Sequence, residues 1–324
     1  MRLTCGLDLG GTKILGVVLD VDSDGGPLLE AKVPTPAGTG AICSALVEVG
    51  QDLRDRAGKE LGAEVEAVGL GAPGLVDRTG TLRYGPNLPG VIDLDLATVL
   101  GEGLLVPVTV DNDATCATWG EHERGVARGQ NHTVMITLGT GIGAGVVVKG
   151  EVLRGAHGFA GEAGHMVVNP AGPPCPCGRR GCWERYASGS GLGFLAREAA
   201  HARRGELMIA LAGGDAENVR GEHVTAAASD GDAEALDVLA KFGWWVALGV
   251  ANLVNILDSE MVVIGGGLAE AGELVLAPTR TAFKELVLAV DHRPEVAIVG
   301  ARLGQHAGAI GAALLAGARS IEMA

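Results

Sequence analysis

The segment from Gly161 to Ser188 constrains the fold of this chain more than any other. It reads GEAGHMVVNPAGPPCPCGRRGCWERYAS and contains three cysteines and one histidine. The prolines and glycines around the cysteines exclude a regular helix or a central strand there. A loop with so few apolar side chains needs another source of stability, and three thiolates with one imidazole can bind a structural zinc ion tetrahedrally. The predicted metal ligands are His165, Cys175, Cys177 and Cys182.

The cysteine spacing leaves other interpretations open. Cys175 and Cys177 are closer together than the first cysteine pair of most zinc fingers, so they could instead be a redox pair or form a disulfide. The remaining cysteines, Cys5, Cys43 and Cys116, are scattered in apolar surroundings and are most simply core residues. No signal peptide is recognisable, which predicts a reducing, cytoplasmic compartment in which disulfides are rare. We therefore favour zinc.

Composition limits the class of protein. A length of 324 residues favours two domains, and the core must be aliphatic because 47% of residues are hydrophobic but only 3% are aromatic. The net charge of −14 argues against a nucleic-acid partner, which needs a basic patch. It does not exclude a phosphate site built from backbone N–H groups and a cation. The apolar run 244–257 is interrupted by Asn252 and Asn255 and is too short to span a bilayer, so no membrane partner is expected.

The hydrophobic pattern predicts an α/β protein in which one unit occurs twice. Two strands flank the turn at Gly10 and Gly11, and two more flank the turn 139–143. Either turn alone is typical of an ordinary hairpin, but the pair suggests two turns that face each other across a cleft. Other buried strands are predicted at 28–33, 65–70, 106–110, 261–264 and 295–299. Helices are predicted at 42–57, 114–125, 191–202, 222–228, 233–257, 273–288 and 305–316, with a looser surface excursion at 203–221.

Asp8 ends the first predicted strand, directly before Gly10 and Gly11. Glycines allow backbone N–H groups to approach phosphate oxygens closely, and Thr12 adds a hydroxyl. A carboxylate at this place can hold a magnesium ion, directly or through water. The role of Lys13 stays open, since its side chain could simply be solvated. A dinucleotide-binding fingerprint is excluded because a strand, not a helix, follows Lys13.

Three polar residues, Asp111, Asn112 and Asp113, follow a buried strand and begin a helix. Each is a good N-cap, but one helix needs only one cap. In open α/β sheets ligands bind beyond the carboxyl ends of the strands, and a carboxylate there can accept the proton of a hydroxyl that attacks phosphorus. Asn87 lies in the turn-rich stretch GPNLPG and, from composition alone, is more simply a turn residue than a hydroxyl ligand.

A further glycine turn lies between a buried strand and a helix and consists of Gly265, Gly266 and Gly267. Such a turn can let a flat ring or a ribose lie against the backbone. It could equally be no more than a tight strand-to-helix connection.

Together these motifs resemble the ROK family, which comprises bacterial sugar kinases and related transcriptional repressors. DLGGTK at 8–13 and LGTGIGAG at 138–145 are similar to its two phosphate motifs, DNDA at 111–114 to its catalytic-base motif, and VVIGGG at 262–267 to its adenosine motif. GEAGH at 161–165 and CPCGRRGCWE at 175–184 resemble its zinc motif, with no ligand missing. The resemblance covers essentially the whole chain and is greatest to the glucose kinases of the family.

The resemblance implies the actin-like ATPase (ribonuclease H-like) fold, an α/β fold of two domains with mixed central sheets. The small domain would comprise residues 1–113 plus about 305–324, with the final helix returning to it. The large domain, 114–304, would carry the zinc loop. In this family the two domains close over a cleft that holds ATP and sugar.

The resemblance also implies a role for each motif residue. Asp113 would be the general base, and the zinc would be structural because four protein ligands leave no open position. His165 would offer its second ring nitrogen to a sugar hydroxyl. The sugar hydroxyls would be held by Asn87, Asn112, Asp113, Glu162, His165 and Glu184. ATP and Mg²⁺ would be held by Asp8, Gly10, Gly11, Thr12, Lys13, Gly139, Thr140, Gly141, Gly265, Gly266 and Gly267.

The activity implied is phosphorylation of the glucose 6-hydroxyl by Mg-ATP. No nucleophilic triad is needed, since phosphoryl transfer depends on positioning and electrostatics. N-acetylglucosamine, N-acetylmannosamine and fructose stay open as substrates. Polyphosphate stays open as donor, although the relatives that use it typically lack the zinc loop. A sugar-responsive repressor is disfavoured, because a strand that starts at Leu3 leaves no room for an N-terminal helix-turn-helix. A homodimer or homotetramer is expected from the family.

Overall fold

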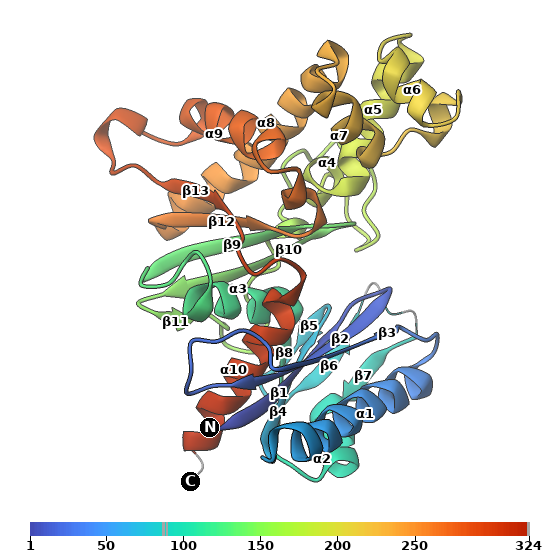
Figure 1. Ribbon diagram of the computed structural model, residues 1–324. Helices are drawn as coiled ribbons and strands as arrows, with labels where there is room; N and C mark the ends of the chain where they lie inside the picture. Colours follow the sequence, from blue (N-terminus) through green and yellow to red (C-terminus); the bar gives the residue numbers. More distant parts are fainter. Residues whose placement is uncertain (86–87, 89, 323–324) are drawn as a thin grey trace. The chain divides into compact units, whose positions relative to one another are not determined.

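The computed structural model describes residues 1–85, 88 and 90–322. These form two compact units (Figure 1). The first comprises Met1–Asn131, Gly145–Gly161 and Arg302–Ala324, and the second comprises His132–Ala144 and Glu162–Ala301. These boundaries differ from the predicted domain limits, which separated 1–113 from 114–304. The first unit extends past residue 113 because α10 (Ala307–Glu322) packs along α3 (Asp113–Arg124).

The first unit contains a five-stranded sheet in the order β3-β2-β1-β4-β8. Its strands are β1 (Leu3–Leu9), β2 (Lys13–Asp20), β3 (Leu29–Pro34), β4 (Val65–Ala72) and β8 (Val108–Asn112). The first three strands pair antiparallel, whereas β4 pairs parallel with β1 and with β8. Helices α1 (Thr39–Arg56), continued by η1 (Ala57–Leu61), and α2 (Leu96–Leu104) pack on one face. Because side chains alternate along a strand, the other face of the sheet also presents apolar residues, and α10 packs on them.

Glycines in the first sheet and in α10 allow the last helix to pack closely against its neighbours. A side chain on Gly6 of β1 or Gly69 of β4 would overlap backbone oxygens of α10. Gly311 of α10 has the same closeness to the carbonyl of Cys116 in α3. Helix, sheet and α3 are therefore in backbone contact, which larger residues would prevent. This packing fixes the carboxyl ends of β1 and β8 against the beginning of α3.

A small antiparallel sheet follows β4 in sequence, with the order β5-β6-β7. Its strands are β5 (Leu75–Val76), β6 (Thr81–Tyr84) and β7 (Ile92–Asp95), none of which was predicted. Asn87 falls between β6 and β7 in the sequence but lies outside the described residues.

A second five-stranded sheet has the order β11-β10-β9-β12-β13. Its strands are β9 (His132–Leu138), β10 (Ile142–Val148), β11 (Glu151–Val152), β12 (Met261–Gly265) and β13 (Ala297–Gly300). β12 pairs parallel with β9 and β13, as β4 does with β1 and β8. The same strand order therefore occurs twice in the chain, as the repeated strand–turn–strand pattern suggested. The boundary between the units falls inside β10.

Most of the helices belong to the second unit. They are α4 (Glu184–Ala187), α5 (Gly189–His201), α6 (Glu206–Leu211), α7 (Gly221–Ser229), α8 (Ala233–Leu257) and α9 (Glu273–Leu286), with short turns η2 (Ala163–His165), η3 (Ala216–Asn218), η4 (Gly267–Ala271) and η5 (Val290–His292), while η6 (Gly304–His306) belongs to the first unit. By length and composition α8 could cross a membrane, but half of its most apolar stretch is buried inside the protein. It packs against α5, α7 and α9 as a core helix.

Candidate active site

Three carboxylates gather at the carboxyl edge of the first sheet. Asp8 of β1 and Asp111 of β8 both pair with Gly71 of β4, so Asp8, Gly71 and Asp111 form one row across the strands. A side chain on Gly71 would come within 3.3 Å of the Cα atom of Asp113. Gly71 thus leaves the space in which the two predicted residues Asp8 and Asp113 meet. The structure brings together residues that are more than a hundred positions apart in the sequence.

The environment of both predicted acids favours the protonated form. Burial, aided by the charge of Asp113, raises the pKa of Asp8 to about 7, while Lys13 acts in the opposite direction. Burial also raises the pKa of Asp113. Hydrogen bonds from the Ala114 N–H at 2.8 Å and from the Asn112 side chain oppose this rise. A carboxyl group with a raised pKa is a stronger base when it is ionised, as a general base requires.

Asn112, and not Asp113, caps the beginning of α3. Its Oδ1 accepts the Thr115 N–H at 3.0 Å, and its Nδ2 donates to the Gly74 carbonyl at 3.1 Å. Asn112 is therefore the N-cap of α3, and Asp113 is the first helical residue. Since an amide has two N–H donors, the hydrogen bond from the Asn112 side chain to Asp113 uses the second one.

The turn between β1 and β2 presents its tip to solvent. The Gly10 N–H donates to the Lys13 carbonyl at 2.9 Å, and the Thr35 hydroxyl donates to the Gly10 carbonyl at 2.7 Å. Gly11 and Thr12 are exposed, and a side chain on Gly11 would meet no atom within 4 Å. Lys13 bonds to the Gln305 side chain at 2.8 Å instead of pointing to the acids. The tip is thus open to a phosphate group.

In the second unit, the turn between β9 and β10 opens on a cavity of about 1290 Å³. Gly139 and Thr140 line it together with Gly267, which begins η4. The beginning of α5 braces the turn, because the Gly189 N–H donates to the Gly139 carbonyl at 2.8 Å and the Ser190 hydroxyl to the Thr140 carbonyl at 3.0 Å. A cavity of this size exceeds the usual range for a drug-sized ligand and has room for a nucleotide.

Sequence reasoning missed most of the residues that line this cavity. Arg185, Arg197 and Arg220 bring three positive charges to it, Glu222 and Glu270 bring two negative ones, and the half-exposed Phe194 brings an aromatic ring. The helix that carries Phe194 and Arg197 was predicted at 191–202, but the short α4 with Arg185 was not, and nothing in a helical pattern identifies which face lines a cavity. Among the predicted glycines of this unit, Gly141, Gly265 and Gly266 are not among the lining residues.

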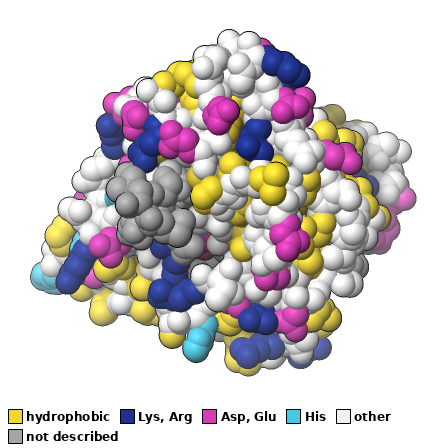
Figure 2. Space-filling view, turned by 90° about the horizontal axis from the view of Figure 1, so that it is seen from below, with side chains coloured by type: hydrophobic (Ala, Val, Ile, Leu, Met, Phe, Trp, Pro, Cys, Tyr) yellow, Lys and Arg dark blue, Asp and Glu magenta, His cyan; other side chains and the backbone are white. Residues whose placement is uncertain are grey.

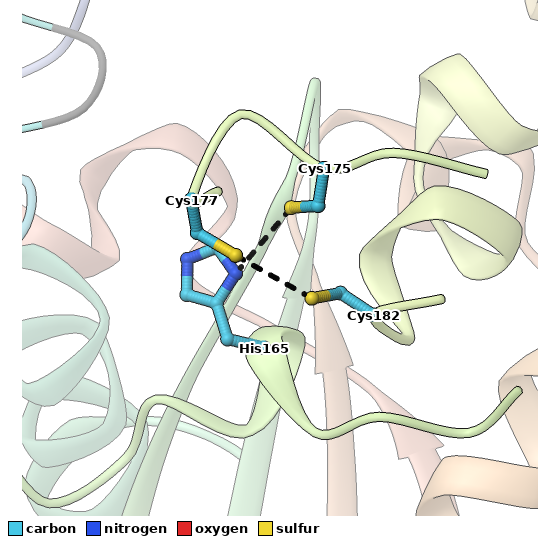
Figure 3. Close-up of side chains that lie close together, drawn as sticks. All are labelled: His165, Cys175, Cys177 and Cys182. Carbon is cyan, nitrogen blue, oxygen red and sulfur yellow. Dashed lines mark hydrogen bonds between the residues drawn. The ribbon is translucent and has the colours of Figure 1, made fainter. Parts of the chain in front are cut away.

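The four predicted metal ligands converge. Their ligand atoms all lie within 4.8 Å of one another (Figure 3). The Sγ atom of Cys175 lies 3.8 Å from Nδ1 of His165, and the Sγ atoms of Cys177 and Cys182 lie 3.5 Å apart. Sulfurs around a tetrahedral zinc ion are about 3.8 Å apart, as Zn–S bonds of about 2.3 Å require. All six cysteines are free thiols, and the donor set fits a zinc ion.

Two acids accompany the metal ligands. Nε2 of His165, the nitrogen on the side away from Cys175, lies 3.9 Å from Oε2 of Glu162. Oε1 of Glu184 lies 3.0 Å from the Sγ atom of Cys175. A side chain on Gly141 would come within 2.8 Å of Oε2 of Glu184. The structure thus brings Glu162, His165 and Glu184 to one place beside the second glycine turn.

A buried tryptophan attaches this loop to the core, which the sequence did not reveal. Trp183 is completely buried and donates from Nε1 to the carbonyl of Trp245 in α8 at 2.7 Å. Its ring lies against Gly249, where any side chain would overlap it. Because Trp183 lies between Cys182 and Glu184, it fixes a metal ligand and an acid at once.

Comparison with known proteins agrees with this architecture. Residues 4–319 match the ROK family model. The chain is 38% identical over 319 residues to a glucokinase of Streptomyces coelicolor, covering 98% of both chains. It is 33% identical over 316 residues to an N-acetylmannosamine kinase of Escherichia coli O157:H7, covering 97% of this chain and 98% of the relative. The solved structure of a ROK family glucokinase from Streptomyces griseus, in complex with glucose and AMPPNP, superposes with a TM-score of 0.86 at 37% identity, over 98% of this chain and 99% of that one.

The doubled sheet topology and the two glycine turns define a protein with the actin-like ATPase fold. Within that class, the chain belongs to the ROK family. The fold class and the family predicted from the motifs are therefore confirmed.

Proposed function

We propose that this protein is an ATP-dependent glucokinase that transfers the γ-phosphoryl group of Mg-ATP to the 6-hydroxyl of glucose. The observation that carries the proposal is the position of the Asp113 carboxylate. It lies at the beginning of α3, where Asn112 caps the helix in its place, and close enough to Asp8 for its charge to raise the pKa of Asp8. Likeness to glucokinases along nearly the whole chain supports glucose as the acceptor.

In this mechanism Asp113 accepts the proton of the 6-hydroxyl as its oxygen attacks phosphorus. Asp8 would hold magnesium, and the fit is good because the negative charge of Asp113 acts on its buried carboxylate, while the nearby Lys13 is hydrogen-bonded to Gln305. Magnesium, when bound, neutralises phosphate charge. The turns at Gly11 and Thr140 would donate backbone N–H groups to phosphate oxygens, and the arginines around the cavity of the second unit would add positive charge.

The sugar hydroxyls would be bound by Asn87, Asn112, Glu162, His165 and Glu184. Hydroxyl recognition by such groups is selective, because a sugar that lacks one hydroxyl leaves a buried polar group unpaired. Zinc on His165, Cys175, Cys177 and Cys182 would hold the loop that carries Glu184 and would take no part in the chemistry.

The base is tested by replacing Asp113 with Asn. The variant should fold normally and lose nearly all phosphotransfer, at least about a thousandfold, since the proton acceptor is gone. Asp95→Asn is the matched control, because Asp95 caps α2 away from the acids and Asn caps equally well. An Asp113→Asn enzyme with full activity would sink the assignment.

The substrate is tested by a screen of glucose, N-acetylglucosamine, N-acetylmannosamine and fructose, each with ATP and with polyphosphate. Glucose with ATP should give the highest kcat/KM. A clear preference for another acceptor or for polyphosphate would replace that part of the proposal.

The zinc is tested by metal analysis of purified, active enzyme. One zinc per chain is expected, and its removal by a chelator should lower stability and weaken glucose binding together. Fully active enzyme without zinc would contradict the structural role.

A homodimer or homotetramer in the cytoplasm completes the proposal, and light scattering on purified protein measures the oligomeric state. No nucleic-acid partner is proposed. On the face shown in Figure 2, the basic side chains are scattered among acidic and hydrophobic ones.

A further inference from the structure

One ion pair beside the acids has no part in the mechanism above. Nε of Arg154 donates to Oδ2 of Asp111 at 2.7 Å. The Asp111 side chain is only 8% exposed and that of Arg154 24% exposed, so the pair is largely removed from water. Oδ1 of the same carboxylate accepts the N–H of Asn112 at 2.9 Å. Asp111 therefore joins Arg154 to the backbone that leads into Asp113.

Asp111 is the third negative charge around Gly71. The Cys116 thiol of α3 lies within 3.4 Å of a side chain placed on Gly71, and burial together with the charges of Asp111, Asp8 and Asp113 raises its pKa, whereas the charge of Arg154 lowers it. Arg154 provides the positive charge on the Asp111 side. The charge of Lys13 acts only on the opposite side, on Asp8.

The reaction uses two of these carboxylates, Asp8 for the cation and Asp113 for the proton. A third uncompensated carboxylate would repel both and would itself be costly to bury. Pairing with Arg154 removes that charge and leaves the other two acids available.

Arg154 is presented by an anchored segment. The guanidinium of Arg78 donates to the carbonyl of Gly155, the next residue, at 2.5 and 3.2 Å. Three residues further on, Gly158 has a positive φ of 100°, and a side chain on it would come within 2.6 Å of the Val76 carbonyl. The segment is thus held in two places besides the ion pair, so Arg154 is held in place without depending on Asp111.

We propose that Arg154 is a positioning residue for phosphoryl transfer, acting through Asp111 to hold the Asn112–Asp113 backbone and to neutralise the third carboxylate of the acid cluster. This inference rests on the proposed function. It predicts a specific pattern in which turnover falls and substrate binding changes little, because the guanidinium of Arg154 is bonded to Asp111 and is not among the groups proposed to bind sugar or nucleotide.

The test is a kinetic comparison of the full-length enzyme with four variants. Arg154→Gln should lower kcat by about tenfold to a hundredfold, the usual effect of a displaced catalytic group, with the KM for glucose changed less than about threefold. Arg154→Lys should keep a large part of the activity because it keeps the charge. Asp111→Asn combined with Arg154→Gln should recover at least several-fold over Arg154→Gln, since no unpaired carboxylate remains.

Arg78→Gln is the matched control, because it loosens the same segment without touching an acid, and it should leave kcat within about twofold of the wild type. Equal loss of kcat in Arg78→Gln and Arg154→Gln would show that only the segment matters and would overturn the inference. So would an Arg154→Gln enzyme with unchanged kcat, or a double variant without recovery. A wild-type enzyme that phosphorylates none of the tested sugars would instead overturn the proposed function, and this inference with it.

Discussion

The contact between Trp183 and Gly249 allows a sharp test of how the metal loop is held. Gly249 lies inside α8, and a side chain there would overlap three atoms of the Trp183 ring. The ring has no free space to enter, since Trp183 is completely buried and its Nε1 is bonded to the Trp245 carbonyl. The perturbation is Gly249→Ala, which adds a single methyl group.

Two opposing effects decide the outcome. Alanine is favoured over glycine in a helix interior by about 1 kcal/mol. Overpacking a core costs about 1–3 kcal/mol, and loss of a buried tryptophan from its site costs about 3–5 kcal/mol. Because the overlap involves the rigid ring and the helix backbone, we expect the packing cost to win. The free energy of unfolding should fall by about 1–3 kcal/mol.

The functional effect should follow from the chain positions next to the ring. Displacement of Trp183 moves Cys182 and Glu184, so the KM for glucose should rise by about tenfold or more, as misplacement of a binding group by about 1 Å does. Urea unfolding and glucose-dependent kinetics measure the two effects.

The control is the same substitution at Gly101, which lies inside α2 and has no atom within 4 Å of an added side chain. Gly101→Ala should stabilise the protein by up to about 1 kcal/mol. In addition, Trp183→Leu should make Gly249→Ala less harmful, because the clash is gone. If Gly249→Ala stabilised the protein as Gly101→Ala does and left the KM unchanged, the reasoning would be refuted.

Three further predictions concern the first unit. Glu121 is completely buried and accepts backbone N–H groups at 2.6 and 2.8 Å, so Glu121→Gln should destabilise the protein by about 2–4 kcal/mol in urea unfolding. The matched change at the half-exposed Glu123, Glu123→Gln, should alter stability by less than about 0.5 kcal/mol, and equal effects would contradict this account. The pKa of Asp8 is raised to about 7, so between about pH 4 and pH 7 the folded metal-free protein binds one proton more than the unfolded chain does. The free energy of unfolding should therefore fall, relative to that of Asp8→Asn, as the pH rises through that window. Parallel pH curves of the two proteins would show that the Asp8 carboxyl group is not buried as described. Gly11→Ala should leave stability unchanged, since the added methyl meets no atom, but raise the KM for ATP about tenfold or more; an unchanged KM would exclude phosphate binding at this turn.

Local patterns in the sequence predicted the elements that have a strong hydrophobic period or clear helix-ending and turn residues. The bounds of α8 were predicted as observed, 233–257, from its long apolar run. In the structure, Asp232 caps the beginning of the helix, and the helix ends at Asp258, which has the left-handed conformation. The two glycine turns were also identified from short motifs, as were the four predicted metal ligands, whose ligand atoms converge in the structure. Asn87 stays a prediction, because it lies outside the described residues.

The short elements were not predicted because they lack a period long enough to recognise. β5, β6 and β7 have two to four residues each, and α6 has six. α6 lies within 203–221, where a loose excursion was expected. Their conformation is set by tertiary contacts, and single-sequence propensity is too weak to reveal that.

Contacts between distant segments were also beyond the sequence. Arg154 and Asp111 are 43 positions apart, and Trp183 and Trp245 are 62 apart. An arginine in a loop or a glycine in a helix has many ordinary explanations, and only the folded chain shows what it meets. The sequence could therefore suggest candidate residues for the chemistry but not the residues that hold those candidates in place.

The two copies of the sheet topology differ in charge in a way that suits the reaction. The first turn follows Asp8, and Asp111 and Asp113 join it, so negative charge gathers at the edge of the first sheet. The second turn, at Gly139 and Thr140, lines a cavity to which three arginines and two glutamates contribute, so positive charge is in slight excess there. Under the proposed function, the acidic edge needs a cation and a hydroxyl, whereas the arginine-lined cavity needs an anionic phosphate chain. Each unit thus has a glycine turn whose backbone N–H groups could bind phosphate, while the acids proposed to act on the hydroxyl and the cation belong to the first unit.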